Sequence, residues 1–184
     1  MGGSESRRAL QPLAGVFGAR VMSNNTTVRI AEARPMDNYT LQLKWQNGRR
    51  LPVDLAEPVH RLRGLRTLRD PAFFARAQVG ESGHSVEWPG DLDIGAARLW
   101  ELALEQNGHA DAAEFIRWRW RHGLSLSAAA EALGISRRQV AYYASGDESV
   151  PRYILLACKG WEAQHECALC AGCFQQPVRG ARIP

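Results

Sequence analysis

Cysteine is missing from the first 157 residues of the chain, and all four cysteines lie among the last 27. A disulfide framework would spread across the fold, so the core does not depend on oxidation, as is usual in the reducing cytoplasm. Long apolar runs are missing as well, because no segment approaches the roughly 18 consecutive apolar residues that span a membrane. Near the amino terminus, Gly15 and Gly18 interrupt an apolar stretch that is too short for a secretory signal. We therefore expect a cytoplasmic protein.

A strong charge of one sign is also absent. The net charge of +4 permits a polyanionic partner but does not demand one. Hydrophobic residues make up 45% of the chain and charged residues 23%, which is ordinary for a folded protein and argues against overall disorder. A chain of 184 residues is long enough for one medium domain or two small ones.

The residue patterns divide the chain into four parts. Residues 1–25 read as a mobile extension, with Met22 as an alternative start to Met1. Residues 26–100 alternate apolar and polar positions as strands do, whereas residues 109–163 have helical spacing. Residues 164–184 lose periodicity and read as a flexible, cysteine-containing tail. These patterns predict an α+β fold, with a small hairpin-rich N-terminal α/β domain followed by an all-α domain.

Short signals mark several element boundaries. Asn47-Gly48 lies between two alternating runs and predicts a hairpin whose two turn residues both have positive φ. Pro52 then favours an edge strand. Asp70-Pro71 is typical of a helix start. A further helix is expected over residues 93–106, ended by Asn107-Gly108.

The N-terminal part contains a series of spaced blocks. They are Val28-x-Ile30, Tyr39-x-Leu41, Asn47-Gly48, Val53-Asp54-Leu55, Leu68-Arg69-Asp70-Pro71-x-Phe73-Phe74, Val86-x-Trp88-Pro89 and Asp91-Leu92-Asp93. In this order they resemble the domain of unknown function family 2442 over about residues 26–100. The resemblance implies a small α+β fold of hairpins and short helices and implies no activity. Some members of that family resemble this chain in carrying a helix-turn-helix behind the domain.

Residues 124–146 have the pattern of two short helices joined by a sharp turn. Ser125 or Ser127 is expected to cap the first helix, and Gly134 to end it in the left-handed conformation. Ser136 is then expected to cap the second helix. Val140 and Tyr143, three residues apart, should face the core, and five residues should face outward: Arg137, Arg138, Gln139, Ala141 and Tyr142.

With its flanking helices, over about residues 111–162, this segment resembles the Cro/lambda-repressor-type (Xre-like) helix-turn-helix. The resemblance implies that the helix after Ser136 enters the major groove of duplex DNA. The residues expected to contact DNA are Ser127, Ser136, Arg137, Arg138, Gln139 and Tyr142. Arginine suits guanine and glutamine suits adenine, while a tyrosine can contact a thymine methyl group or a phosphate. One departure is Leu126, where the class often has a glutamine that contacts phosphate.

The charge of the helical region affects the expected partner. Residues 109–163 contain seven lysines and arginines and six carboxylates, so the affinity of one monomer for DNA should be modest. A homodimer on a two-fold site would compensate. We expect a bacterial transcriptional regulator, neither an enzyme nor a cofactor-binding protein, whose N-terminal domain mediates dimerisation, a protein contact or ligand sensing. The alternative is a protein-interaction module, such as the antitoxin-like partner of a small toxin, with secondary DNA binding.

Two groups in the N-terminal part could indicate catalysis. Asp91 and Asp93 could do acid–base work or bind a metal, or they could be a solvated loop in which Asp93 caps the following helix. Ser82, His84 and Ser85 lie together in the sequence, but no nucleophile elbow accompanies them. The solvated loop is the interpretation that we favour, and we expect no hydrolase.

Three further features leave two interpretations each. The arginine-rich residues 60–69 could contact phosphate or form a solvated face. The aromatic residues Trp118, Trp120 and Tyr143 could stack on bases, but core packing is the interpretation that we favour. The run His165-x-Cys167-x2-Cys170-x2-Cys173 is too compact for a usual zinc site and lacks the fourth cysteine of an iron–sulfur run, so we expect a reduced tail without metal.

Overall fold

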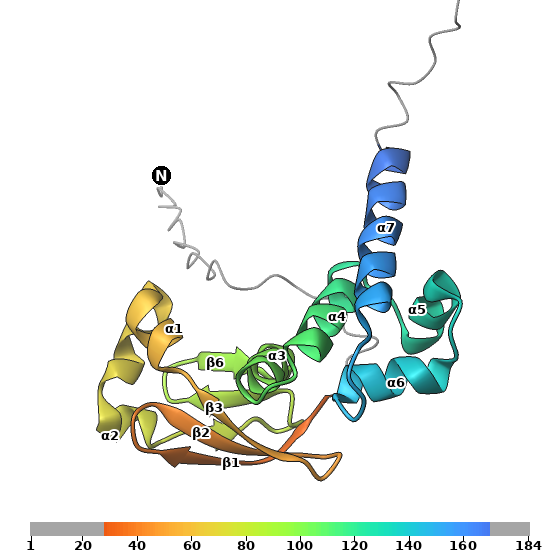
Figure 1. Ribbon diagram of the computed structural model, residues 1–184. Helices are drawn as coiled ribbons and strands as arrows, with labels where there is room; N and C mark the ends of the chain where they lie inside the picture. The colour runs from red at the N-terminus through yellow and green to blue at the C-terminus, as the bar shows by residue number, and fades with distance from the viewer. Residues whose placement is uncertain (1–27, 170–184) are drawn as a thin grey trace, which may run out of the picture.

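The computed structural model describes residues 28–169 and has the predicted α+β architecture, with two three-stranded antiparallel sheets followed by a helical region (Figure 1). The strands are β1 (Ile30–Met36), β2 (Thr40–Trp45), β3 (Arg50–Asp54), β4 (Gln78–Val79), β5 (Ser85–Trp88) and β6 (Leu92–Gly95). The helices are α1 (Ala56–Arg61), the 3₁₀ helix η1 (Arg63–Arg69), α2 (Pro71–Phe74), α3 (Ala96–Gln106), α4 (Ala110–Arg121), α5 (Leu126–Leu133), α6 (Arg137–Ser145) and α7 (Arg152–Leu169).

The first sheet has the order β1-β2-β3, which confirms the predicted hairpin and the edge position of Pro52. The turn geometry differs from the prediction. Gly48 has positive φ and Asn47 does not, and Trp45 N–H donates to Arg49 O across a three-residue loop. The hairpin therefore has a three-residue loop that ends in a left-handed glycine, not the predicted two-residue turn. Such a loop needs positive φ at one residue only, and Gly48 provides it.

The second sheet has the order β4-β5-β6. The helix predicted to begin at residue 93 begins at Ala96, because the residues before it form β6. Asp93 lies within β6, opposite Glu87 of β5, so it does not cap α3. The N-cap of α3 is Gly95, and its C-cap is Asn107, as predicted. The cap at Asp70 is confirmed, because its carboxylate accepts the Ala72 N–H at 3.0 Å.

A single hydrophobic core joins the sheets to the helical region. Trp45 of β2 meets Trp100 of α3 edge-on, with 4.8 Å between ring centroids. The indole N–H of Trp100 in turn donates to Ala144 O in α6 at 3.2 Å. Helix α3 therefore packs on both parts that the sequence separates into domains of residues 26–100 and 109–163. That division into domains stays a prediction.

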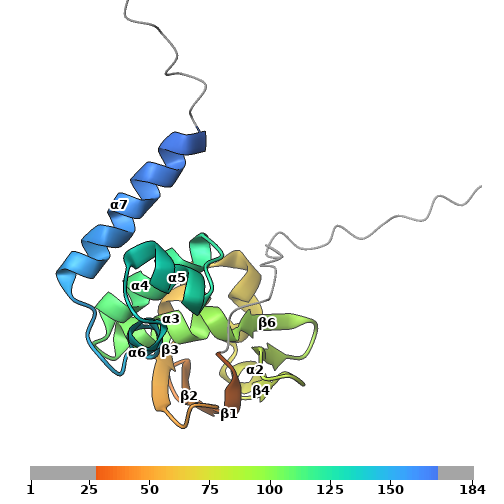
Figure 2. The same ribbon diagram turned by 90° about the vertical axis from the view of Figure 1, so that its right-hand side faces the viewer.

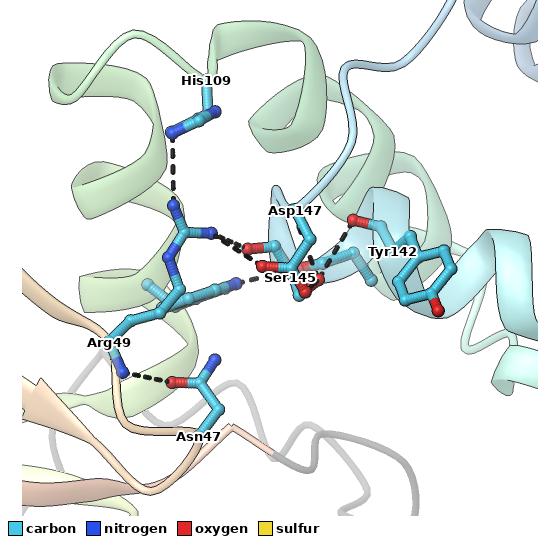
Figure 3. A network of polar contacts seen from close by, with 8 residues as sticks. Asn47, Arg49, His109, Tyr142, Ser145 and Asp147 are labelled. Atoms are coloured by element: carbon cyan, nitrogen blue, oxygen red, sulfur yellow. Dashed lines mark hydrogen bonds and ion pairs between the residues drawn. The ribbon is translucent and has the colours of Figure 1, made fainter.

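The carboxyl end of α6 is held against the β2–β3 hairpin by Arg49 (Figure 3). The Arg49 guanidinium donates to Ser145 O, lies 3.8 Å from a carboxylate oxygen of Asp147, and donates to His109 Nε2 at 3.2 Å. A cation at this end also complements the negative pole of the helix. Contacts between residues 96 positions apart thus fix the end of α6.

The loop after α6 is anchored to α4 through Asp111. The Asp111 carboxylate accepts the Ser149 hydroxyl at 2.7 Å and the Val150 N–H at 2.5 Å. Burial by itself raises the pKa of Asp111, but these hydrogen bonds outweigh it and hold the pKa below its usual value of 3.8.

Helix α7 continues to Leu169 and extends away from the sheets (Figures 1 and 2). Residues 164–169 are therefore helical, where the sequence predicted the start of an irregular tail. No helix within residues 28–169 is both long and apolar enough to cross a membrane. The predicted extension over residues 1–25, together with Cys170 and Cys173, lies outside the described residues.

We expect the variant Arg49→Met to lose about 1–3 kcal/mol of unfolding free energy, because the carbonyl of Ser145 and the ring of His109 lose a charged donor. For a chain of this size, each kcal/mol lowers the melting temperature by about 2–4 °C. Thermal unfolding followed by circular dichroism measures the change. The exposed neighbour Arg50 provides the matched control, and Arg50→Met should change stability by less than about 0.5 kcal/mol. Equal melting temperatures for the two variants would contradict the assigned role.

Candidate functional site

Helix α5 begins at the serine cap of the predicted motif. Of the two candidate serines, Ser125 is the cap, because its hydroxyl accepts the Ala128 N–H at 2.9 Å. Ser127 lies in the first turn of α5 with its side chain exposed. Its hydroxyl is thus open to an outside partner.

The turn between α5 and α6 has the predicted geometry. Gly134 has φ 65° and ψ 29°, a left-handed conformation that other residues adopt only at a cost. The half-buried Ile135 follows, and its N–H donates to Ala130 O at 3.0 Å. Ser136 caps α6 by accepting the Gln139 N–H at 3.1 Å. The local hydrogen bonds of these residues therefore set the direction in which α6 leaves the turn.

The inner face of α6 packs as predicted. Val140 and Tyr143 are buried, and the Tyr143 ring meets Phe115 of α4 edge-on at 5.7 Å. Burial raises the pKa of the Tyr143 phenol. Trp118 is buried as well, whereas Trp120 is half-buried. Trp118 and Tyr143 are thus core residues, and no base can stack on them.

The amino-terminal end of α6 is the exposed end. Arg137 and Arg138 both have exposed side chains. Arg138 Nε donates to the Tyr142 hydroxyl at 2.7 Å, and its guanidinium lies 5.2 Å from the centroid of that ring. Because a guanidinium has five donors, this contact orients Arg138 and leaves its terminal nitrogens for other acceptors.

Two residues of the predicted outward face have partners within the chain. The side-chain amide of Gln139 donates to a carboxylate oxygen of Glu148 at 2.5 Å. Ala141 is half-buried and lines a cavity together with Trp120 and Trp45. The exposed surface of α6 is therefore narrower than the sequence predicts, with its cations in the first turn.

The arginine-rich residues 60–69 lie at the opposite end of the molecule from α5 and α6 (Figure 1). Arg69 donates to Val59 O and His60 O, and Arg61 pairs with Glu57 at 2.9 Å. The side chains of Arg63 and Arg66 are exposed. This segment is thus spatially separate from the predicted DNA-contacting residues.

The other candidates do not assemble into a site. The Ser85 hydroxyl donates to Glu87 at 2.7 Å, while Asp91 lies in an exposed turn with φ 59°. Among residues 28–165, whose side chains the structure describes, no three histidine, cysteine or acidic side chains are placed to hold a metal ion. Cys158, which lies in the predicted helical region of residues 109–163, is buried against the core, and burial raises its pKa to about 12. That thiol is therefore unreactive at neutral pH.

Comparison with known proteins finds a family match for the N-terminal region. Residues 30–105 match the family model described as “Protein of unknown function (DUF2442)”, which confirms the predicted resemblance. A comparison with curated proteins finds no match. One solved structure, that of the “Putative DNA Binding Protein NE0471” from Nitrosomonas europaea, is 34% identical. The similarity covers 89% of this chain and 99% of that one, with a TM-score of 0.60.

Proposed function

The chain belongs to the same protein family as NE0471 of Nitrosomonas europaea, and from that premise we propose that it binds double-stranded DNA in a sequence-specific manner. The observation that carries the proposal is the exposure of Arg137 and Arg138 in the first turn of a serine-capped helix whose other end is held by Arg49. The description of NE0471 as a “Putative DNA Binding Protein” supports it. This role is one of binding, not of catalysis.

In the proposed complex, the first turn of α6 enters the major groove as the second helix of a helix-turn-helix. Arg137 and Arg138 donate to guanine O6 and N7, which match the fork of a guanidinium group. Tyr142 holds Arg138 in place through its hydroxyl. The hydroxyls of Ser127 and Ser136 face phosphate at the amino-terminal ends of α5 and α6, where the helix dipoles favour an anion.

Gln139, unlike Arg137 and Arg138, already has a side-chain partner within the chain. Its amide is held by Glu148 at 2.5 Å, so it must exchange that partner before it can read adenine. The exposed carboxylates of Glu131 and Glu148 also lower the positive potential beside α6. Specificity therefore depends chiefly on the two arginines.

We further propose that the protein acts as a homodimer and as a transcriptional regulator. Two large hydrophobic side chains of α7 are largely exposed. The exposed fraction is 68% for Tyr153 and 56% for Leu156. They are three residues apart and so lie on one face of the helix. A second copy covering this face would double the number of contacts to DNA on a two-fold site.

The double variant Arg137→Ala/Arg138→Ala should bind the preferred DNA of the parent chain at least about tenfold more weakly, since each bidentate contact to a base is worth roughly 1–3 kcal/mol. The DNA is first selected from a random pool by the parent chain. Affinities are then measured by fluorescence anisotropy at one stated salt concentration, because phosphate contacts make them depend on salt.

The matched control for this experiment is Arg63→Ala/Arg66→Ala, which removes the same charge from the distant end of the molecule. It should stay within about threefold of the parent, because a distant solvated face neutralises no phosphate. If both double variants bind the selected DNA with equal affinity, the assignment of α6 is wrong.

Replacing both exposed residues of α7, as Tyr153→Gln/Leu156→Gln, should convert the dimer to a monomer. Each apolar side chain that leaves the interface costs about 1.5–3 kcal/mol of association free energy. Light scattering after size exclusion gives the mass, compared with 20.4 kDa for one chain. Met36→Gln, which changes an equally exposed residue on β1, should remain dimeric. A parent chain that is monomeric, or a dimeric α7 variant, would refute the proposed interface.

A further inference from the structure

The N-terminal region reaches the outer face of α6 at a cavity of about 200 Å³. Arg29 and Asn47 line this cavity from the N-terminal side, and Ala141 lines it from α6. Ala141 lies four positions after Arg137 and three after Arg138, so it is a neighbour of both on the surface of the helix. The surface that carries the two arginines of α6 therefore continues to Arg29 and Asn47.

Arg29 combines a fixed backbone with a side chain that has no partner in the chain. Its carbonyl accepts the Gln46 N–H at 2.9 Å, and the N–H of the next residue, Ile30, donates to Gly83 O at 2.8 Å. The residue is exposed, and within the described part of the chain no hydrogen bond or ion pair holds its guanidinium. The five donors of that group therefore remain for an acceptor from outside the chain.

Asn47 supplies a further donor in the loop between β2 and β3 (Figure 3). Its Oδ1 accepts the Arg49 N–H at 3.1 Å, which orients the amide group. Its Nδ2 has no partner among the described residues, so it is left to donate. Arg49 also joins this loop to Ser145 O at the end of α6, and the loop is thereby held beside that helix.

A cationic donor and an amide donor side by side suit the oxygens of a nucleic acid backbone, because arginine and asparagine are among the residues that bind phosphate. The place of these donors along α6 also fits. Ala144, which lines the same cavity, is about 10 Å along the helix from Arg137 at 1.5 Å per residue. The major groove is about 12 Å wide, so donors beside this part of α6 meet phosphates at the edge of the groove when the first turn lies inside it.

We propose that Arg29 and Asn47 bind the phosphate backbone of DNA at the edge of the groove that α6 enters. The inference rests on the proposed DNA binding and gives the N-terminal region a direct contact in it. Contacts to phosphate carry no base preference, but they fix the register and orientation of a protein on the duplex. Arg29 and Asn47 are thus positioning residues for Arg137 and Arg138.

The variant Arg29→Ala should bind the DNA selected by the parent chain about three- to tenfold more weakly. The slope of log Kd against log salt should fall in magnitude by about 0.9 for each copy of Arg29 in the complex. Fluorescence anisotropy between about 50 and 200 mM salt measures both quantities. Arg29→Lys keeps the charge and should keep the slope. Arg34→Ala, which removes an exposed arginine from β1 away from the cavity, is the matched control and should change neither quantity.

A second pair of variants tests the amide donor. Asn47→Asp keeps the oxygen that accepts the Arg49 N–H but replaces the donor by a negative charge. Binding should weaken at least about fivefold at low salt, where repulsion between exposed charges is least screened. Asn38→Asp adds the same charge in the turn between β1 and β2, at the other end of β2, and should stay within about twofold of the parent.

Equal affinities and equal salt slopes for Arg29→Ala and Arg34→Ala would overturn the inference. So would a changed base preference when DNA is selected anew by Arg29→Ala. If Arg137→Ala/Arg138→Ala still weakens binding, either result leaves the proposed role of α6 intact. A parent chain that selects no DNA would refute the proposed function and this inference together. Arg29→Ala should also melt with the parent, because its guanidinium has no partner within the described residues.

Discussion

The guanidinium of Arg49 determines which part of α6 remains open to a partner. It joins the tip of the β2–β3 hairpin to the last carbonyl of the helix, and Trp100 adds a second hydrogen bond one residue earlier. The carboxyl end of α6 therefore belongs to the core shared with the N-terminal region. Within α6, Arg137 and Arg138 of the first turn have the most exposed side chains, and the residues after them are half-buried or buried. The N-terminal region thus holds the carboxyl end of α6 in place.

The sequence predicts well those features that depend on residues close to one another in the chain. The cap at Ser136, the left-handed Gly134 and the inward Val140 and Tyr143 follow from local hydrogen bonds and from helical spacing, and all four are found. Arg49 could not be predicted in this way, because its partner Ser145 is 96 residues away and no short motif marks the pair. The cavity lined by Trp45, Trp120 and Ala141 could not be predicted either, because segments far apart in the sequence form it.

Errors arose where tertiary pairing outweighed a local signal. Asp93 has the residue type of a helix cap, but pairing of β6 with β5 extends the strand through Gly95 and moves the cap there. Residues 164–169 lack a clear apolar period, yet they continue α7 because the preceding turns of that helix are anchored on the core through Ile154 and Cys158. In both places the competing contact comes from another segment of the chain.

Methylation interference is a direct test of the proposal that guanidinium groups in the first turn of α6 bind guanine in the major groove. Methylation of guanine N7 blocks one of the two acceptors that an arginine fork needs. If Arg137 and Arg138 bind guanine in this way, methylating guanines in each half-site weakens binding of the parent chain, and the effect disappears when both arginines are replaced by alanine. Parent binding that is indifferent to methylation at every guanine of the site would contradict it.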